Sequence, residues 1–217
     1  MKSLFLLALT FVSLSFFGCR VYPETPLEIA AVSGDVQAIR ALLAKDGSPD
    51  EMDSHSLTPL IMAARAGQVG AVAALLDGGA HVDLPDRHVN GWTPLMHAIH
   101  KERTPAASLL LDRGADPNAR SWNGTTALMM AAGEGNAEIV RALLDHGADA
   151  RAENLDRVTA LTNAVAGGHE EIVRILLKAA PDLQLRYTLE DTAAILMARI
   201  RGQRELVHLV VHEAQDR

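Results

Sequence analysis

One pattern of apolar and polar positions occurs five times along the chain, and each occurrence opens on a threonine. The spacings are 33, 35, 33 and 33 residues, from Thr25 to Thr58, Thr93, Thr126 and Thr159. Each threonine is followed by Pro-Leu or Ala-Leu, then by small residues and later by a Leu-Leu pair. A threonine that accepts an early backbone N–H caps a helix, and proline suits the first helical turn. The pattern therefore predicts two helices per unit, with the leucine pair on the second.

Composition and turn residues fit a stack of such units. Hydrophobic residues make up 48 % of the chain but aromatic residues only 4 %, which favours a small aliphatic core of closely packed helices. A single unit cannot bury its apolar face alone, so the units must stack. Glycines after the second helix, such as Gly114 and Gly147, suit a left-handed cap. Asn90-Gly91 and Asn123-Gly124 are tight-turn signals just before the next threonine.

Some positions depart from the repeating pattern. Glu102 stands where the other units have a glycine between their two helices, and Pro105 falls in the expected first turn of a second helix. Ser56 and Arg157 stand at turn positions where glycine is usual, so we expect those two turns to differ in type. The loop over residues 83–91 is two residues longer than its counterparts.

The period near 33 residues, the Thr-Pro-Leu words and the Gly-Ala-Asp closings at 114–116 and 147–149 together resemble the ankyrin repeat family. The resemblance covers almost all of the chain after Cys19. It implies an all-α ankyrin-repeat solenoid of helix-turn-helix units with short β-turn fingers. We expect one such domain over residues 25–217, with units opening near the five threonines and a degenerate C-terminal unit opening near Ala193. The first and last units would act as caps.

The N-terminal residues have the features of a targeting segment. Lys2 precedes an apolar stretch over residues 4–17, which is too short to span a membrane and suits a signal-peptide core. The stretch ends in Gly18-Cys19, which resembles the bacterial lipobox, although Phe16 stands where leucine is usual. We expect a signal peptide over residues 1–18 and a lipid anchor on Cys19, with a short linker over residues 19–24. An ordinary cleaved signal is the alternative.

Charge and motif content exclude several functional classes. The net charge is −7 without a long basic run, which disfavours nucleic acid as a partner. The chain carries no catalytic motif and no Gly-rich phosphate loop, so we expect no enzyme and no cofactor. Nine histidines raise the possibility of a metal. His97 instead occupies a slot that is usually apolar, and His208 and His212 suit the C-terminal end of a helix. We therefore expect no metal site.

The ankyrin resemblance also implies where a partner binds: the concave side, formed by the fingers and the outward positions of each first helix. Both tryptophans, Trp92 and Trp122, fall on adjacent fingers, and the long loop should present Trp92 further out than a standard finger would. Exposed tryptophan is a typical hot spot, although both rings could instead pack for stability. The other mapped positions are His55, Arg65, Asn90, His100, Lys101, Asn123, Glu134 and Asp156.

The sequence thus predicts a membrane-tethered, periplasmic protein-binding module. Its membrane contact would be the lipid anchor alone, and outer-membrane sorting is favoured because Arg20 after the cysteine is not aspartate. One alternative is an inhibitor or immunity protein that blocks an envelope enzyme or toxin. Another is a protein that binds a metal or ligand through its histidines. The identity of the protein partner is not encoded in these patterns.

Overall fold

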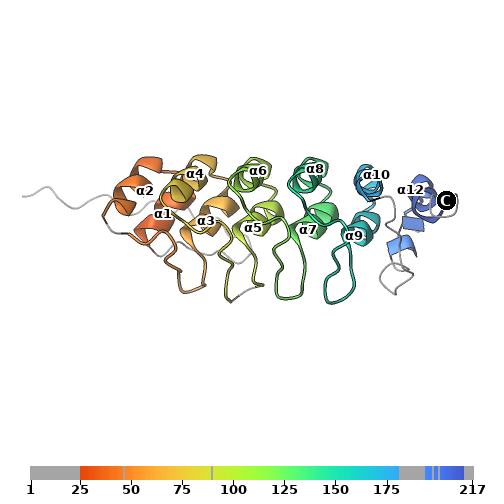
Figure 1. Cartoon of the computed structure of the whole chain (residues 1–217), viewed down its shortest axis with the longest axis horizontal. Coiled ribbons are helices and arrows are strands. Elements are labelled where there is room, and N and C mark those ends of the chain that lie inside the picture. The colour runs from red at the N-terminus through yellow and green to blue at the C-terminus, as the bar shows by residue number, and fades with distance from the viewer. Residues whose placement is uncertain are drawn as a thin grey trace, which may run out of the picture.

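The computed structural model describes residues 25–45, 47–88, 90–180, 194–196, 198–199 and 201–212. They form two parallel layers of helices, with loops that project from one layer (Figure 1). The layer that carries the loops holds the inner helices: α1 (Pro26–Ser33), α3 (Pro59–Ala66), α5 (Pro94–His100), α7 (Ala127–Glu134) and α9 (Ala160–Gly167). The outer helices form the other layer: α2 (Val36–Leu43), α4 (Val69–Asp77), α6 (Thr104–Asp112), α8 (Ala137–Asp145), α10 (Glu170–Ala179) and α12 (Arg204–His212).

Every inner helix from α1 to α9 begins as the sequence predicts. The five threonines have extended backbones, and each side-chain oxygen accepts the backbone N–H of the third helical residue. Thr25 adds a capping box, because the Glu28 carboxylate accepts the Thr25 N–H at 3.0 Å. Proline occupies the first helical position of α1, α3 and α5. The local signals therefore mark the start of each of these inner helices in the sequence.

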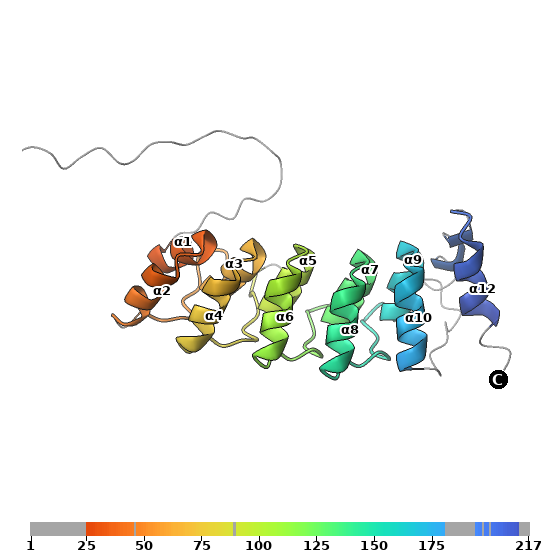
Figure 2. The same cartoon turned by 90° about the horizontal axis from the view of Figure 1, so that it is seen from above.

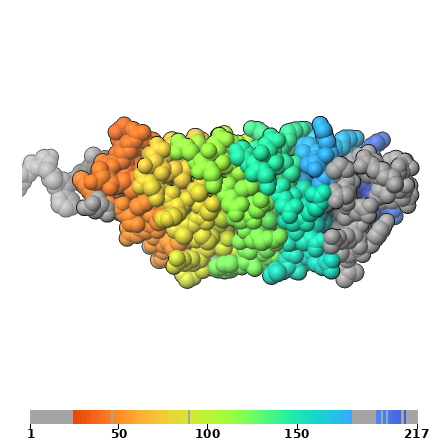
Figure 3. All heavy atoms as spheres, in the orientation of Figure 1, coloured from red at the N-terminus to blue at the C-terminus, as the bar shows by residue number. Residues whose placement is uncertain are grey.

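The units share a single continuous core. Each inner helix packs against the next inner helix, and each outer helix against the next outer helix (Figure 2). In units two to five the first leucine of each pair is buried: Leu75, Leu110, Leu143 and Leu176. One hydrophobic cluster runs from Leu27 to Leu206. In the space-filling view, units abut without a gap through residues 25–180 (Figure 3). The expected all-α stack of helix pairs is thus confirmed.

The backbone stays regular where the sequence departs from glycine. Ser56 and Arg157 adopt left-handed φ values of 57° and 62°, close to the 69° of Gly91 in the corresponding place. The expectation that these two turns differ in type is therefore wrong. Hydrogen bonds within each finger hold this geometry, because the N–H groups of Ser56 and Arg157 donate to the carbonyls of Asp53 and Asn154, and the side chains tolerate it at some cost in strain. Glu102 likewise has φ 56° in the slot where Gly135 has 83°.

The C-terminal unit is described in part. Ala198 is fully buried, Gly202 has a φ of 72°, and Leu206 on α12 is buried. Ala193 lies outside the described residues, as do Cys19 and all of residues 1–24. Within the described part of the chain, no helix is long and apolar enough to cross a membrane.

Candidate binding surface

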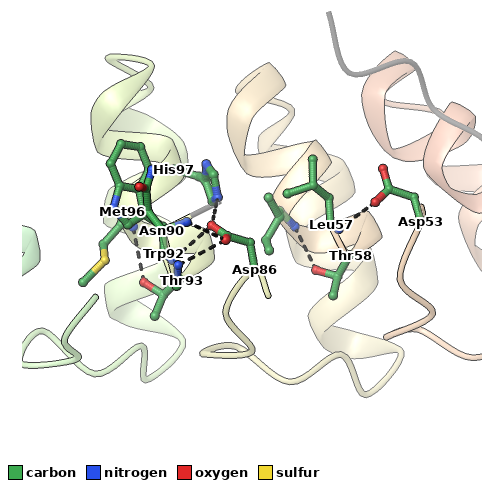
Figure 4. A network of polar contacts seen from close by, with 11 residues as sticks. Asp53, Leu57, Thr58, Asp86, Asn90, Trp92, Thr93, Met96 and His97 are labelled. Atoms are coloured by element: carbon green, nitrogen blue, oxygen red, sulfur yellow. Dashed lines mark hydrogen bonds and ion pairs between the residues drawn. The ribbon is translucent and has the colours of Figure 1, made fainter. Parts of the chain in front are cut away.

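A side-chain oxygen closes each finger between α2 and α9 that the structure describes. In the three ordinary fingers it belongs to the residue five positions before the helix-capping threonine: Asp53, Ser121 and Asn154. Each of these oxygens accepts the N–H of the residue immediately before the threonine. In the long finger Asp86, seven positions before Thr93, takes the same role (Figure 4). These residues were not predicted from the sequence, although an Asp, Asn or Ser five positions before the threonine was the available signal in the three ordinary fingers.

Asp86 organises the two extra residues of the long finger. Its carboxylate accepts the backbone N–H groups of Asn90, Gly91 and Trp92 at 3.0–3.1 Å. Oδ2 of Asp86 also lies 3.0 Å from Nε2 of His97 on α5, and both side chains are buried (Figure 4). The longer loop is therefore anchored to α5 through one buried carboxylate.

His97 is held as a structural donor to this carboxylate. Burial lowers the pKa of His97, and the hydrogen bond to Asp86 offsets part of that effect, while Arg65 lowers the pKa further. A neutral imidazole with its proton on Nε2 suits the hydrogen bond to an ionised Asp86. The expectation that His97 is a core or half-buried side chain is confirmed, since only 4 % of it is exposed.

Adjacent fingers are linked at their tips. The N–H of Trp122 donates to the Asn90 carbonyl at 3.0 Å, and the N–H of Leu155 donates to the Asn123 carbonyl at 2.9 Å. The indole of Trp122 lies over Gly91, where an added Cβ would come within 2.5 Å of the ring. Trp122 is nevertheless 59 % exposed, and Leu155 is 77 % exposed. The two tips together present an apolar ridge to solvent.

Trp92 does not protrude as the long loop suggested. Its side chain is half-buried and packs against the hydrophobic core. The ring makes edge-on contacts with His97 and His100, with centroids 5.4 and 5.1 Å apart. The expectation that Trp92 stands further out than a standard finger is wrong, because Asp86 holds the Trp92 N–H against α5. The two tryptophans therefore occupy different environments.

Trp92 instead lines a hollow on the inner helices. The hollow has a volume of about 500 Å³ and extends across α5, α7 and α9. Three of the predicted binding residues meet there: Trp92, His100 and Glu134. Nδ1 of His100 lies 3.3 Å from Oε1 of Glu134, which links α5 to α7. Met130 and Asn163 also line the hollow, and neither was predicted from the sequence as a binding residue.

The other predicted binding residues do not line the hollow. His55, Asn90, Asn123 and Asp156 are exposed on the fingers, and Lys101 is exposed at the end of α5. Arg65, on α3, is half-buried, and its carbonyl accepts Nε of Arg103. Oδ1 of Asn123 is engaged inside its own finger, where it accepts the Ser121 hydroxyl at 2.6 Å.

The described residues contain no group of three His, Cys, Asp or Glu side chains placed to hold a metal ion. For His208 and His212 the structure describes the backbone but not the side chain, so this finding does not extend to them.

Comparison with known proteins accords with the helix pairs and their fingers. The sequence matches the family model described as ankyrin repeats (3 copies) over residues 9–86, 27–121 and 118–187, which together cover most of the chain. A comparison with curated proteins finds no match. Ankyrin repeats act in protein–protein interaction. On its family match and its stacked helix pairs, the chain belongs to the ankyrin repeat proteins.

Proposed function

We propose that this ankyrin repeat protein is a non-enzymatic module that binds another protein through its finger tips and inner helices. The observation that carries this proposal is the apolar ridge of Trp122 and Leu155, which stands in solvent on two adjacent fingers. Large apolar side chains at the tips of projecting loops contribute little to the core. Such side chains become hot spots when a partner covers them.

We also propose that a lipid on Cys19 holds the domain at the periplasmic side of a bacterial envelope, with outer-membrane sorting. This part rests on the sequence of residues 2–20 alone. Only residues 20–24 separate Cys19 from Thr25, which opens the first unit, and five extended residues reach at most about 18 Å. The binding surface would then work close to the bilayer.

The test of partner binding is in situ crosslinking with the full chain carrying a C-terminal tag. Trp122→Ala with Leu155→Ala should abolish partner recovery while the far-ultraviolet circular dichroism signal is retained. The matched control is Arg40→Ala with Asp145→Ala, two exposed positions on outer helices α2 and α8, which should leave recovery unchanged. Equal recovery with both double variants would contradict the proposal. If the captured protein is an enzyme or toxin whose activity is blocked by binding, the module acts as an inhibitor or immunity protein.

The test of tethering is Cys19→Ser. The variant should be released from membranes or remain uncleaved, as followed by membrane fractionation and by mass measurement of the intact chain. A Cys19→Ser protein that is cleaved and still fractionates with membranes would rule out the lipid anchor.

A further inference from the structure

The hollow across α5, α7 and α9 is an open one and lies where the inner helices carry small residues. Seven residues after the opening threonine, the second and third units carry Arg65 and His100, whereas the fourth and fifth carry Gly133 and Ala166. Eight residues after the threonine, the fifth unit carries Gly167 where the third has Lys101. The small residues therefore lie together on two adjacent inner helices. The larger side chains of the third unit, among them Trp92 and His100, line the hollow beside them.

The surfaces of this hollow suit an aliphatic chain. Trp92 and Met130 are half-buried and offer an aromatic ring and a flexible thioether side chain. The backbone carbonyl of Gly133 already has a hydrogen-bond partner, because it accepts from Nε2 of His169 at 3.0 Å. The side-chain amide of Asn163 donates to the Met129 carbonyl at 2.9 Å. That bond fixes the amide and leaves its oxygen as an acceptor.

The lining of the hollow carries a negative charge, while Nη1 of Arg201, which is not part of the lining, donates to the carbonyl of Ala166 on the α9 side. Among the described residues that line it, Glu134 is the one with a formal charge at neutral pH, and no lysine or arginine is present. Oε1 of Glu134 faces His100, and 34 % of the Glu134 side chain is exposed. A purely apolar occupant would take this carboxylate further out of water, with the contact to His100 as its partial compensation, and this is unfavourable for a charged group. An occupant with a positively charged end would pair with it, and the Trp92 ring would favour the same charge.

We propose that the hollow receives an arginine or lysine side chain of the partner protein. The aliphatic part of that side chain lies against Trp92 and Met130, and its charged end pairs with Glu134. The apolar ridge of Trp122 and Leu155 contacts a different part of the same partner. This assignment rests on the proposed protein-binding function and names the chemistry of one of its contacts.

The first experiment uses the full-length Trp122→Phe variant, in which Trp92 is the remaining tryptophan of the two in the chain. The probe is an acetylated, amidated pentapeptide with one arginine between glycines, and the readout is Trp92 fluorescence. The control peptide replaces arginine with citrulline, which has nearly the same shape without the charge. The arginine peptide should bind at least about tenfold more tightly than the citrulline peptide. Equal binding of the two peptides, or no binding of either, would overturn the proposal.

The second experiment asks whether Glu134 supplies the selectivity. Glu134→Gln should remove the preference for arginine, whereas Glu138→Gln, an exposed position on outer helix α8, should retain it. Panning a library of displayed random peptides against the same proteins gives an independent readout. Basic residues should be enriched on the parent protein and not on Glu134→Gln. Enrichment that is the same on both would also overturn the assignment.

The outcomes separate this inference from the proposed function. If partner capture depends on Trp122 and Leu155 but peptides show no charge preference, the module binds a protein and the cationic contact is wrong. If the arginine peptide binds through Glu134 but the ridge variants do not alter capture, the hollow has the stated chemistry and the proposed function fails.

Discussion

Nε2 of His97 lies 3.0 Å from Oδ2 of Asp86, and this contact between two buried side chains holds the long finger against α5. The same carboxylate accepts the N–H groups of Asn90, Gly91 and Trp92. One aspartate therefore sets the shape of the finger and the position of the Trp92 ring beside the hollow. An insertion of two residues is accommodated because their polar backbone groups have a buried acceptor.

Asp86→Ala should lower the free energy of unfolding more than the equivalent change in an ordinary finger. It leaves the buried N–H groups of Gly91 and His97 without an acceptor, as well as two partly buried ones, and each buried group costs about 1–3 kcal/mol. We expect a loss of about 3 kcal/mol, measured by chemical denaturation. Asp53→Ala is the matched change, because Asp53 accepts the N–H groups of His55 and Leu57, and it should cost about 1–2 kcal/mol. A smaller loss at Asp86 than at Asp53 would contradict this account.

Acidification should weaken the fold through His97. Its pKa is lowered in the folded protein, mainly by burial, whereas in the unfolded chain it is about 6.5. Above that pH both states are neutral at this site. As the pH falls below it, the unfolded chain binds a proton and the folded chain resists, so stability is lost. Between about pH 7.5 and about pH 5.5, the free energy of unfolding should fall more steeply for the parent than for His97→Gln.

His81 provides a control of opposite sign. Its hydrogen bond with Asp50 raises the pKa of this exposed histidine, so its contribution to stability is present at low pH and is lost as the pH rises. His81→Gln should therefore make the decline on acidification steeper, not shallower. If both variants change the pH profile in the same direction, the assignment to His97 is wrong.

The helix pairs could be predicted from the sequence because their signals are local. A threonine cap acts within one turn, and the leucine pairs recur at a constant period, so helix starts and buried faces followed from the residues. The left-handed backbone at Ser56, Arg157 and Glu102 could not be predicted in this way. Their own preference is against a left-handed backbone, and the hydrogen bonds that close each turn override it: the three N–H groups donate to the carbonyls of Asp53, Asn154 and Ile99.

The binding surface was only partly predictable for a related reason. The register placed Trp92, His100 and Glu134 on one face, and all three line the hollow, but register alone does not give burial. The position of Trp92 depends on Asp86, a residue outside the repeating words that acts across six positions. The hollow depends on which small residues meet from α7 and α9, and that becomes visible only when the units are stacked.

Glu102→Gly should stabilise the protein. At a φ of 56° a residue with a Cβ is strained by about 1–2 kcal/mol. Glycine relieves this strain but costs about 0.5–1 kcal/mol of stability, because it makes the unfolded chain more flexible. The expected net gain is about 0.5–1 kcal/mol, visible as a higher melting temperature. The adjacent Lys101 has an ordinary φ of −95°, so Lys101→Gly should be destabilising. A destabilising Glu102→Gly would show that the glutamate is not strained there.

The two tryptophans should separate stability from binding. Trp92 is half-buried against the core and contacts His97 and His100, so Trp92→Ala should cost about 2–3 kcal/mol of folding stability. Trp122 is mostly exposed over Gly91, so Trp122→Ala should shift the melting temperature little.

Partner capture by the single variants completes this comparison. Trp122→Ala should weaken capture by about 2 kcal/mol or more, roughly thirtyfold in affinity, without unfolding the domain. Trp92→Phe, which keeps an aromatic ring beside the two histidines, tests the hollow at lower cost to stability than Trp92→Ala. A Trp122→Ala protein that melts well below the parent would assign the exposed ring a structural role in joining the fingers. If that variant is stable and captures the partner as well as the parent does, the binding surface does not include this ridge.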